Sequence, residues 1–384
     1  MKKTIVWLLV LIFIVSVAFF STGCRTAAVE TTAAAETTAA ETTAAETTAA
    51  ETTAAATEKT TINGKPLSEI VIGKVPILLA NPYHQADVEH FVKYAKEEYG
   101  IKDVVVIDSE IDSAKAVEAL DQLLALNVDA ISFHSIDPDA AIPGITQAID
   151  SGIPIITFYT PLKDQLAPHV TIKEAPTSKQ MGVIAATKWK EFYPDIPIKI
   201  GLVEYVGLEQ TLRERSEPFI EGVLSVDPTA EVISRLDGGG VMENAMKSAQ
   251  DMIVANPDIN IFYGTSADYS LGTLAALEAA GRGKAENGVP LTEILVGTDA
   301  SESELLKLYD PSSSLKITQG LTPKENGQLK VDTLIKMLYG EIGLSDKVEF
   351  AGSNFVFDYW SVNVEDAEAW MKEEYNSDVS LSGE

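Results

Sequence analysis

Cysteine, histidine and basic residues are all scarce in this sequence of 384 residues. The single cysteine, Cys24, excludes an intrachain disulfide, so burial of apolar surface must hold any folded domain together. Four histidines and one cysteine leave little material for a zinc site, and we expect no metal and no other cofactor. The 29 Lys+Arg stand against 57 Asp+Glu, a formal net charge of −28. This balance argues against nucleic-acid binding and against docking on anionic lipid through a basic patch.

Motifs of several enzyme classes are also missing. The sequence has no P-loop, no Gly-x-Ser-x-Gly and no His-Glu-x-x-His. The glycine run 238–240 lies between a predicted strand and a predicted helix, where it could cradle a phosphate, although a plain turn is the commoner use. Acidic residues are so abundant that no particular pair indicates acid–base chemistry. We therefore predict no catalytic residues, and an extracytoplasmic enzyme is a distant alternative.

Residues 1–24 have the pattern of an export signal. Lys2 and Lys3 precede an almost unbroken apolar run over Thr4–Phe20, and Ser21-Thr22-Gly23-Cys24 follows at once. Small residues before a lone cysteine resemble the lipobox of bacterial lipoproteins, in which the signal is cleaved on the N-terminal side of the cysteine and the cysteine sulfur is lipidated. We predict a lipoprotein signal peptide with Cys24 as the lipidation site. The alternative is an uncleaved anchor helix with an incidental cysteine, and both place the body outside the cytoplasmic membrane.

Residues 25–66 have a different composition. Glu-Thr-Thr-Ala-Ala recurs from Glu36, Glu41 and Glu46, and large apolar side chains are almost absent. Such a segment cannot offset its ordering entropy by burial, so we predict a disordered linker that spaces the body from the membrane. A glycosylated stalk, or a repeat that binds a partner, is the alternative.

From about Leu67 onward, short β-rich apolar runs alternate with amphipathic stretches of helical length. The runs predict strands at 75–80, 104–107, 130–134, 155–158, 198–203, 231–235, 259–263, 294–297 and 315–318. The stretches predict helices around 86–99, 113–126, 178–192, 209–225, 244–255 and 270–280. Gly100 and Gly281 are candidate C-caps, and Asp112-Ser113 and Thr177-Ser178 candidate N-caps. Two sets of alternating strands and helices predict an α/β fold with two doubly wound parallel-sheet lobes.

Five segments of the body carry recognisable motifs, in this order: 77–84 (ILLANPYH), 131–139 with 152–157 (GIPIIT), 212–219 (LRERSEPF), 268–281 and 296–299 (VGTD). Together they resemble the periplasmic sugar-binding proteins of the ribose/galactose type, the substrate-binding proteins of ABC importers. The resemblance covers about Val75 to Asn363. It implies a type I periplasmic-binding-protein fold, whose chain crosses three times between the lobes, here near 172–176, 319–323 and 351–354. The lobes would comprise 67–174 plus 321–351 and 175–320 plus 352–384.

The resemblance also implies a ligand site between the lobes. Asp299 would accept hydrogen bonds from sugar hydroxyls and Arg215 would donate them; a helix N-cap and an exposed partner of Glu209 or Glu214 are the alternative roles. Asn81, Tyr83 and His84 lie on the loop after the first strand, where either ring could stack on a sugar face. Asn81-Pro82 could instead form a plain turn, and His84 could be a solvated loop histidine.

Several positions depart from the family's pattern. Tyr159-Thr160 stands where an Asp-Arg pair is usual in the family, so one carboxylate and one guanidinium are missing. Tyr159 instead offers an aromatic ring on which a sugar could stack. Ser266 replaces an asparagine, and Gln319 is offset by about two positions from the hinge glutamine. We keep Tyr159, Ser266 and Gln319 as candidate ligand-binding residues. These departures predict a ligand other than ribose bound in the usual manner, for example another monosaccharide, a deoxy- or modified sugar, or a nucleoside-like molecule.

The sequence thus predicts a monomeric substrate-binding lipoprotein that captures a small sugar by hinge closure and delivers it to an ABC permease. The membrane would be contacted through the lipid anchor only. The same residues would serve a receptor for a chemotaxis or signalling sensor, because both functions use lobe closure.

Overall fold

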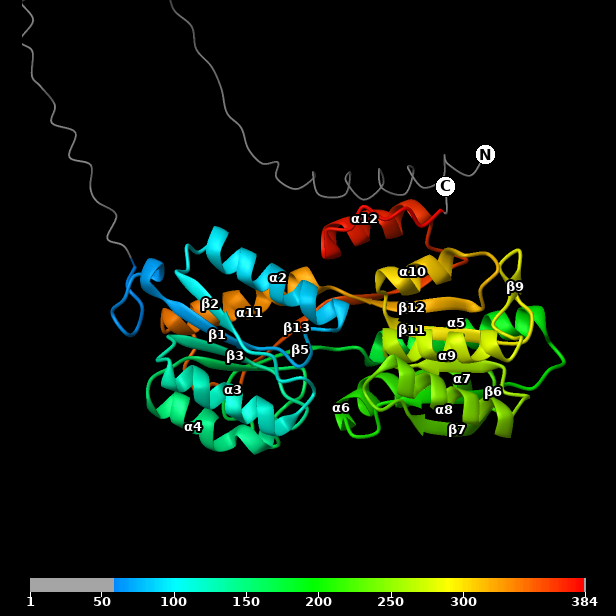
Figure 1. The fold of residues 1–384 in the computed structure, drawn as a ribbon, viewed down its shortest axis with the longest axis horizontal. Coiled ribbons are helices and arrows are strands. Elements are labelled where there is room, and N and C mark those ends of the chain that lie inside the picture. The colour runs from blue at the N-terminus through cyan, green and yellow to red at the C-terminus, as the bar shows by residue number, and fades with distance from the viewer. Residues whose placement is uncertain (1–58, 383–384) are drawn as a thin grey trace, which may run out of the picture. The chain divides into compact units, whose positions relative to one another are not determined.

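Two six-stranded sheets organise the structure, which is a computed structural model that describes residues 59–382 (Figure 1). The predicted signal peptide, Cys24 and residues 25–58 of the predicted linker lie outside the described residues. Each sheet carries helices on both faces, so the predicted α/β fold with two doubly wound lobes is confirmed.

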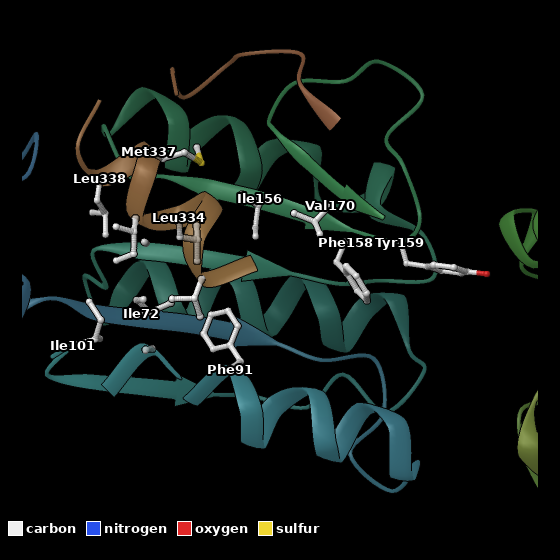
Figure 2. Close-up of a cluster of buried hydrophobic side chains, with 14 of the residues drawn as sticks. Ile72, Phe91, Ile101, Ile156, Phe158, Tyr159, Val170, Leu334, Met337 and Leu338 are labelled. Carbon is white, nitrogen blue, oxygen red and sulfur yellow. The ribbon is translucent and has the colours of Figure 1, made fainter. Parts of the chain in front are cut away.

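The sheet of the first lobe is parallel throughout, with strand order β13-β5-β4-β3-β1-β2. Its strands are β1 (Val71–Val75), β2 (Asp103–Val106), β3 (Ala130–Phe133), β4 (Ile155–Phe158), β5 (His169–Ile172) and β13 (Glu349–Gly352). Its helices are α2 (Pro82–Glu97), α3 (Ser113–Ala125), α4 (Ile142–Asp150) and α11 (Pro323–Leu338). One core lies between the sheet and α2 and α11 (Figure 2), and a second lies between the sheet and α3 and α4.

The sheet of the second lobe has the order β14-β12-β11-β8-β6-β7 and is parallel except at its edge, where β14 runs antiparallel to β12. Its strands are β6 (Lys199–Glu204), β7 (Glu231–Asp237), β8 (Ile261–Gly264), β11 (Ile294–Asp299), β12 (Leu315–Leu321) and β14 (Asn354–Asp358). Its helices are α5 (Ala175–Phe192), α6 (Glu209–Thr211), α7 (Glu217–Val226), α8 (Met242–Ala255), α9 (Ala267–Ala279), α10 (Glu302–Tyr309) and α12 (Val364–Tyr375). A short hairpin of β9 (Ala285–Glu286) and β10 (Val289–Pro290) is separate from both sheets.

The chain passes between the sheets after β5, after β12 and after β13. A hydrogen-bond chain links these three passages. Gln319 Nε2 donates to Asn354 Oδ1 at 3.0 Å, and Asn354 Nδ2 donates to the Lys173 carbonyl at 3.0 Å. Gln319 Oε1 also accepts from Ser178 Oγ at 3.2 Å. The amide side chains of Gln319 and Asn354 therefore hold the three passages of the hinge together.

Helix α12 bridges the two lobes (Figure 1). Its apolar side, including Ala367 and Met371, packs in a buried cluster with α10 and β14 of the second lobe. Its last turn reaches the first lobe, where Glu374 Oε2 accepts from the Lys324 N–H of α11 at 2.8 Å. The Glu374 carbonyl also lies 2.7 Å from Nε2 of His90 on α2. The helix therefore packs on one lobe and is tethered by polar contacts to the other.

Most predicted elements agree with the structure to within a few residues, but the first predicted strand is wrong. The strand expected at 75–80 is β1 in the structure, and it spans Val71–Val75. It ends before Pro76, which has no N–H to donate to the hydrogen bonds of the sheet. The charged Lys74 interrupts the apolar run of β1 in the sequence. In the structure it is buried, because its Nζ lies 2.9 Å from Asp87 Oδ2 on α2. The hydrophobic pattern therefore did not reveal this strand, because one of its buried residues is a lysine in an ion pair.

Three of the predicted helix ends are confirmed and one is wrong. Asp112 caps α3 by accepting from the N–H groups of Ala114 and Lys115, and Gly100 and Gly281 have the positive φ of C-caps. The predicted cap at Thr177-Ser178 lies inside α5, which begins at Ala175. There Glu214 Oε2 accepts from the N–H groups of Glu174, the N-cap residue, and Ala175, so a residue distant in the sequence supplies the cap.

No helix among residues 59–382 has both the length and the apolar composition needed to span a bilayer.

Helices α5 and α7 approach each other more closely than side chains would allow. A Cβ on Gly182 would lie 2.1 Å from the Phe219 carbonyl oxygen, and one on Gly222 would lie 2.0 Å from that of Lys179. Both glycines are therefore needed for backbone contact between the helices, and α7 continues directly from the segment that carries Arg215.

We expect Gly182→Ala to lower the free energy of unfolding by about 1–3 kcal/mol, because the added methyl group must push the two helix backbones apart. Urea denaturation followed by circular dichroism measures this change. Gln180→Ala, at an exposed position on the same helix, is the control and should leave stability within about 0.5 kcal/mol. An unchanged midpoint for Gly182→Ala would contradict the close helix contact.

Candidate functional site

A pocket lies between the two lobes at the carboxyl ends of strands from both sheets, the usual place for ligands in open α/β folds. It encloses about 820 Å³, including the part that is open to solvent. Seven of the eight predicted site residues line it: Asn81, Tyr83, His84, Tyr159, Arg215, Ser266 and Asp299. The structure therefore brings together residues that are more than 200 positions apart in the sequence.

Gln319 is the exception. It is fully buried and does not line the pocket, because its side chain is used in the hydrogen bonds to Ser178 and Asn354 at the hinge. The structure thus gives Gln319 a place in the connection between the lobes rather than in the pocket wall.

The loop after β1 brings Asn81, Tyr83 and His84 to the pocket. Asn81 is the N-cap of α2, since its Oδ1 accepts from the N–H groups of Tyr83 at 2.9 Å and His84 at 3.4 Å, and Pro82 occupies the first helical position. Burial lowers the pKa of His84 to about 3, so its ring is neutral. The cap fixes the first turn of α2, which in turn fixes both rings at the pocket wall.

Arg215 enters the pocket from an unusual turn of helix. Residues 212–216 form a π-helical turn between α6 and α7, in which the Glu217 N–H donates to the Leu212 carbonyl. Pro218 lacks an N–H and its ring would clash with the Glu214 carbonyl in a regular helix, so the wider turn accommodates it. The predicted single helix over 209–225 is therefore interrupted where its functional side chain lies.

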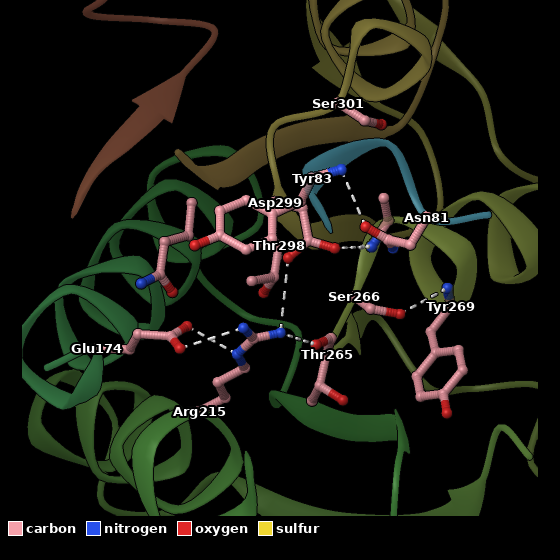
Figure 3. A network of polar contacts seen from close by, with 12 residues as sticks. Asn81, Tyr83, Glu174, Arg215, Thr265, Ser266, Tyr269, Thr298, Asp299 and Ser301 are labelled. Atoms are coloured by element: carbon pink, nitrogen blue, oxygen red, sulfur yellow. Dashed lines mark hydrogen bonds and ion pairs between the residues drawn. The ribbon is translucent and has the colours of Figure 1, made fainter. Parts of the chain in front are cut away.

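Arg215 is buried and its guanidinium is already paired (Figure 3). Nε and Nη2 donate to the two carboxylate oxygens of Glu174 at 2.7 and 3.1 Å, and Nη1 donates to the Thr265 carbonyl at 2.6 Å. Nη1 also lies 3.6 Å from Asp299 Oδ1. Neither predicted alternative partner, Glu209 or Glu214, takes this role, and the fixed guanidinium offers little further hydrogen-bonding capacity.

Asp299 ends strand β11 and faces Arg215. Its Oδ2 accepts from the Ala267 N–H at 3.1 Å, in the first turn of α9, and Ser301 rather than Asp299 caps α10. Burial raises the pKa of Asp299 to about 6, while Arg215 and the Ala267 N–H act in the opposite direction. Its φ of 97° is a strained conformation for a residue with a side chain, a feature that concentrates at functional sites.

Ser266 and Tyr269 form the pocket wall at the start of α9. Ser266 is the N-cap, and its Oγ accepts from the Tyr269 N–H at 3.3 Å. The Tyr269 hydroxyl accepts from the Gly240 N–H at 2.8 Å. A Cβ on Gly238 would lie 2.7 Å from the Tyr269 ring, so the glycine run 238–240 makes room for an aromatic side chain that lines the pocket.

An aromatic cluster covers the first-lobe side of the pocket. His134, directly after β3, makes edge contacts with His84, Phe158 and Tyr159 at centroid distances of 5.5, 5.0 and 6.2 Å. Burial holds the pKa of His134 well below its usual range. Tyr159 has a φ of 58°, and its hydroxyl points away from the hydrophobic core (Figure 2). The Arg215 guanidinium lies 5.7 Å from the Tyr159 ring centre, a contact between the lobes.

His134 was missed in the sequence, although its position at the carboxyl end of a predicted parallel strand was a usable signal. Its Nε2 is buried and has no hydrogen-bond partner among the described residues. The same holds for the hydroxyl groups of Tyr83, Tyr159 and Thr265, all on residues that line the pocket. The Tyr159 hydroxyl lies near Glu174, which together with burial raises its pKa, but it makes no well-formed hydrogen bond. Buried polar groups without partners indicate places where a ligand or water completes the site.

Among residues 59–382, no group of three or more acidic, histidine or cysteine side chains is arranged to hold a metal ion.

Residues 72–342 match the sequence pattern of the periplasmic binding protein domain family. The chain belongs to this family. The resemblance to the periplasmic sugar-binding proteins of the ribose/galactose type is thereby confirmed.

Known relatives agree with this assignment at low identity. The chain is 24% identical over 215 residues to the ABC transporter periplasmic-binding protein YphF of Escherichia coli. The aligned region covers 54% of this chain and 64% of that protein. The chain is 22% identical over 278 residues to the ribose import binding protein of Bacillus subtilis, with coverage of 71% and 83%. A crystal structure of a galactofuranose-binding protein superposes with a TM-score of 0.66 at 18% identity, covering 81% of this chain and 100% of that one.

We expect Glu174→Gln to destabilise the folded protein by about 3–5 kcal/mol, because it leaves the buried Arg215 guanidinium without its counter-charge. Urea denaturation measures the loss. Glu209→Gln is the matched control, since Glu209 is exposed on the neighbouring helix and should have almost no effect. Equal stability of the two variants would show that the ion pair does not support the site.

The raised pKa of Asp299 predicts a pH-dependent stability. In the unfolded chain the carboxyl titrates near pH 4 and in the folded protein near pH 6, so its contribution to stability is lost as pH rises between these values. Asp299→Asn cannot titrate. We therefore expect the stability of this variant relative to the unmodified protein to increase from pH 4 to pH 6 by up to about 3 kcal/mol. A pH-independent difference in urea denaturation would refute the raised pKa.

Proposed function

We propose that this protein is an extracytoplasmic substrate-binding protein that captures a small sugar between its lobes and delivers it to an ABC importer. The observation that carries the proposal is the pocket itself. Tyr83, His134 and Tyr159 reach it from the first lobe, and Arg215 and Asp299 reach it from the second. Family membership supports an extracytoplasmic solute-binding role.

Capture requires that a ligand contact both lobes at once. Aromatic rings on the first lobe cover apolar C–H faces, and the Asp299 carboxylate on the second lobe accepts from hydroxyl groups. A ligand that bridges both surfaces favours the closed arrangement over the open one by its differential affinity. Micromolar binding of a monosaccharide of about twelve heavy atoms needs about 0.7 kcal/mol per atom, which is below the ceiling for small ligands.

The hinge supplies the movement in this mechanism. We propose that residues 67–174 plus 321–351 and residues 175–320 plus 352–384 rotate as two bodies about the three passages. The Gln319–Asn354–Lys173 chain lies at these passages and supports their movement as one unit. Asn81, Tyr83, His84, Tyr159, Arg215, Ser266 and Asp299 form the proposed ligand site.

Delivery requires that the protein remain near the permease. We propose that the signal is cleaved before Cys24, which removes residues 1–23, and that the Cys24 sulfur carries the lipid, with residues 25–66 as a spacer between the lipid and the lobes. The composition of this spacer, rich in Thr, Ala and Glu, supports a solvated tether. The anchor is the proposed membrane contact, and the lobes act as a monomer.

Small-angle X-ray scattering during a sugar titration tests the capture mechanism. We expect a sugar selected by thermal shift to reduce the radius of gyration of the unmodified protein, and calorimetry to show that Asp299→Ala weakens its binding at least tenfold. Asp251→Ala removes the same charge from an exposed position on α8 and should leave affinity unchanged. Scattering profiles that stay identical with every sugar, nucleoside and polyol tested would refute capture by closure.

A further inference from the structure

Several polar groups of the pocket are already used in hydrogen bonds within the protein. Asn81 Oδ1 caps α2, Ser266 Oγ caps α9, and Asp299 Oδ2 accepts from Ala267 N–H. Arg215 donates three hydrogen bonds to Glu174 and Thr265. Only the remaining capacity of such groups is available to a ligand.

The acceptors that remain are especially limited. Asp299 Oδ1 and the carboxylate of Asp268 are the free anionic acceptors among the described residues that line the pocket, and Asp268 is only half-buried. The neutral His134 ring adds one nitrogen, and hydroxyl groups add weaker, uncharged acceptors: the unpartnered ones of Tyr83, Tyr159 and Thr265, and those of Tyr205 and Thr211. Each sugar hydroxyl that is buried must donate to some acceptor, and only the two carboxylates offer the stronger, charge-assisted hydrogen bonds.

Much of the remaining wall is apolar. Aliphatic side chains reach the pocket from both lobes: Ile77, Leu78, Ile111, Ile136, Leu208 and Leu321. A hydroxyl group placed against such a wall loses its water without gaining a partner, whereas a methyl or methylene group gains contact. At about tenfold per unsatisfied hydroxyl, the wall discriminates between sugars that differ by one oxygen.

The charge of the site limits the ligand further. Arg215 is the one cation among the described residues that line the pocket, and Glu174 and Asp299 already balance it. The histidines there are neutral because burial lowers their pKa. An anionic ligand would meet carboxylates without a free counter-charge, so phosphorylated sugars and uronic acids are disfavoured.

From this inventory we infer that the ligand is an uncharged deoxysugar, a ring that lacks at least one of the hydroxyl groups of the ordinary hexoses and pentoses. This inference rests on the proposed sugar-binding function and specifies it. The missing hydroxyl faces the aliphatic wall, and the remaining ones face Asp299 and the unpartnered hydroxyl groups.

If the ligand is a deoxysugar, Tyr159 is the residue that determines the preference for it over the fully hydroxylated parent sugar. It occupies a position at the end of β4 where a carboxylate would add two acceptors, and it fills that position with a ring. Aspartate tolerates the left-handed backbone found there better than tyrosine does. Tyr159→Asp therefore supplies a hydroxyl acceptor without adding backbone strain.

Matched sugar pairs test the inference by calorimetry on the unmodified protein. The pairs are D-galactose with D-fucose, L-mannose with L-rhamnose, and D-ribose with 2-deoxy-D-ribose, each differing by one hydroxyl. D-Galacturonate, adenosine and uridine complete the panel. We expect the tightest ligand of the panel to be a deoxysugar that binds at least tenfold more tightly than its parent, and galacturonate not to bind.

The outcomes separate the two proposals. A fully hydroxylated parent, galacturonate or a nucleoside as the tightest ligand would overturn the deoxysugar assignment and leave capture by closure intact. Binding by none of the panel would count against the deoxysugar assignment and the sugar-binding function together. In Tyr159→Asp, with folding checked by circular dichroism, the preference for the deoxysugar should fall at least threefold, whereas Tyr159→Phe should keep it.

Discussion

The buried ion pair between Arg215 and Glu174 is the interaction on which the site depends. Glu174 lies where the chain has just left the first lobe, and Arg215 lies on the π-helical turn of the second. Their two-point contact is buried, so removing either partner would leave an uncompensated charge in the interior. The pair holds the guanidinium 3.6 Å from Asp299 Oδ1 and 5.7 Å from the centre of the Tyr159 ring, so the one cation of the pocket lining, within the part of the chain that the structure describes, has a fixed position.

The fold was accessible from the sequence because its central strands are buried on both faces. Runs such as 155–158 and 294–297 contain only residues that a parallel sheet can bury, and their observed bounds begin where the pattern predicts. Elements without this pattern were missed. Strand β5 begins with a histidine and contains a threonine, and β13 begins with an exposed glutamate, so neither has a continuous apolar run.

The sequence largely predicted which residues line the pocket, but not which hydrogen bonds and ion pairs their side chains make. Residues at the carboxyl ends of strands could be recognised as pocket-lining, as Asp299 shows. Hydrogen bonds that join distant positions could not: Glu174 to Arg215, and Lys74 and Lys330 to Asp87, connect residues 13 to 243 positions apart. Such pairs depend on tertiary geometry, which decides whether a charged side chain is a ligand contact, a cap or part of the core.

Helix α12 has a mechanical consequence for the chain's end. Because it packs on the second lobe and its last turn is hydrogen-bonded to the first through Glu374, rotation of the lobes must either carry that turn along or break its contacts. The Tyr375 hydroxyl, one residue further, donates to the Asp299 carbonyl at 3.3 Å, so the same turn also touches the backbone of the ligand site. If the lobes rotate as proposed, the last turn of α12 therefore changes position relative to one of them, and a fluorophore attached close to Tyr375 would report that rotation.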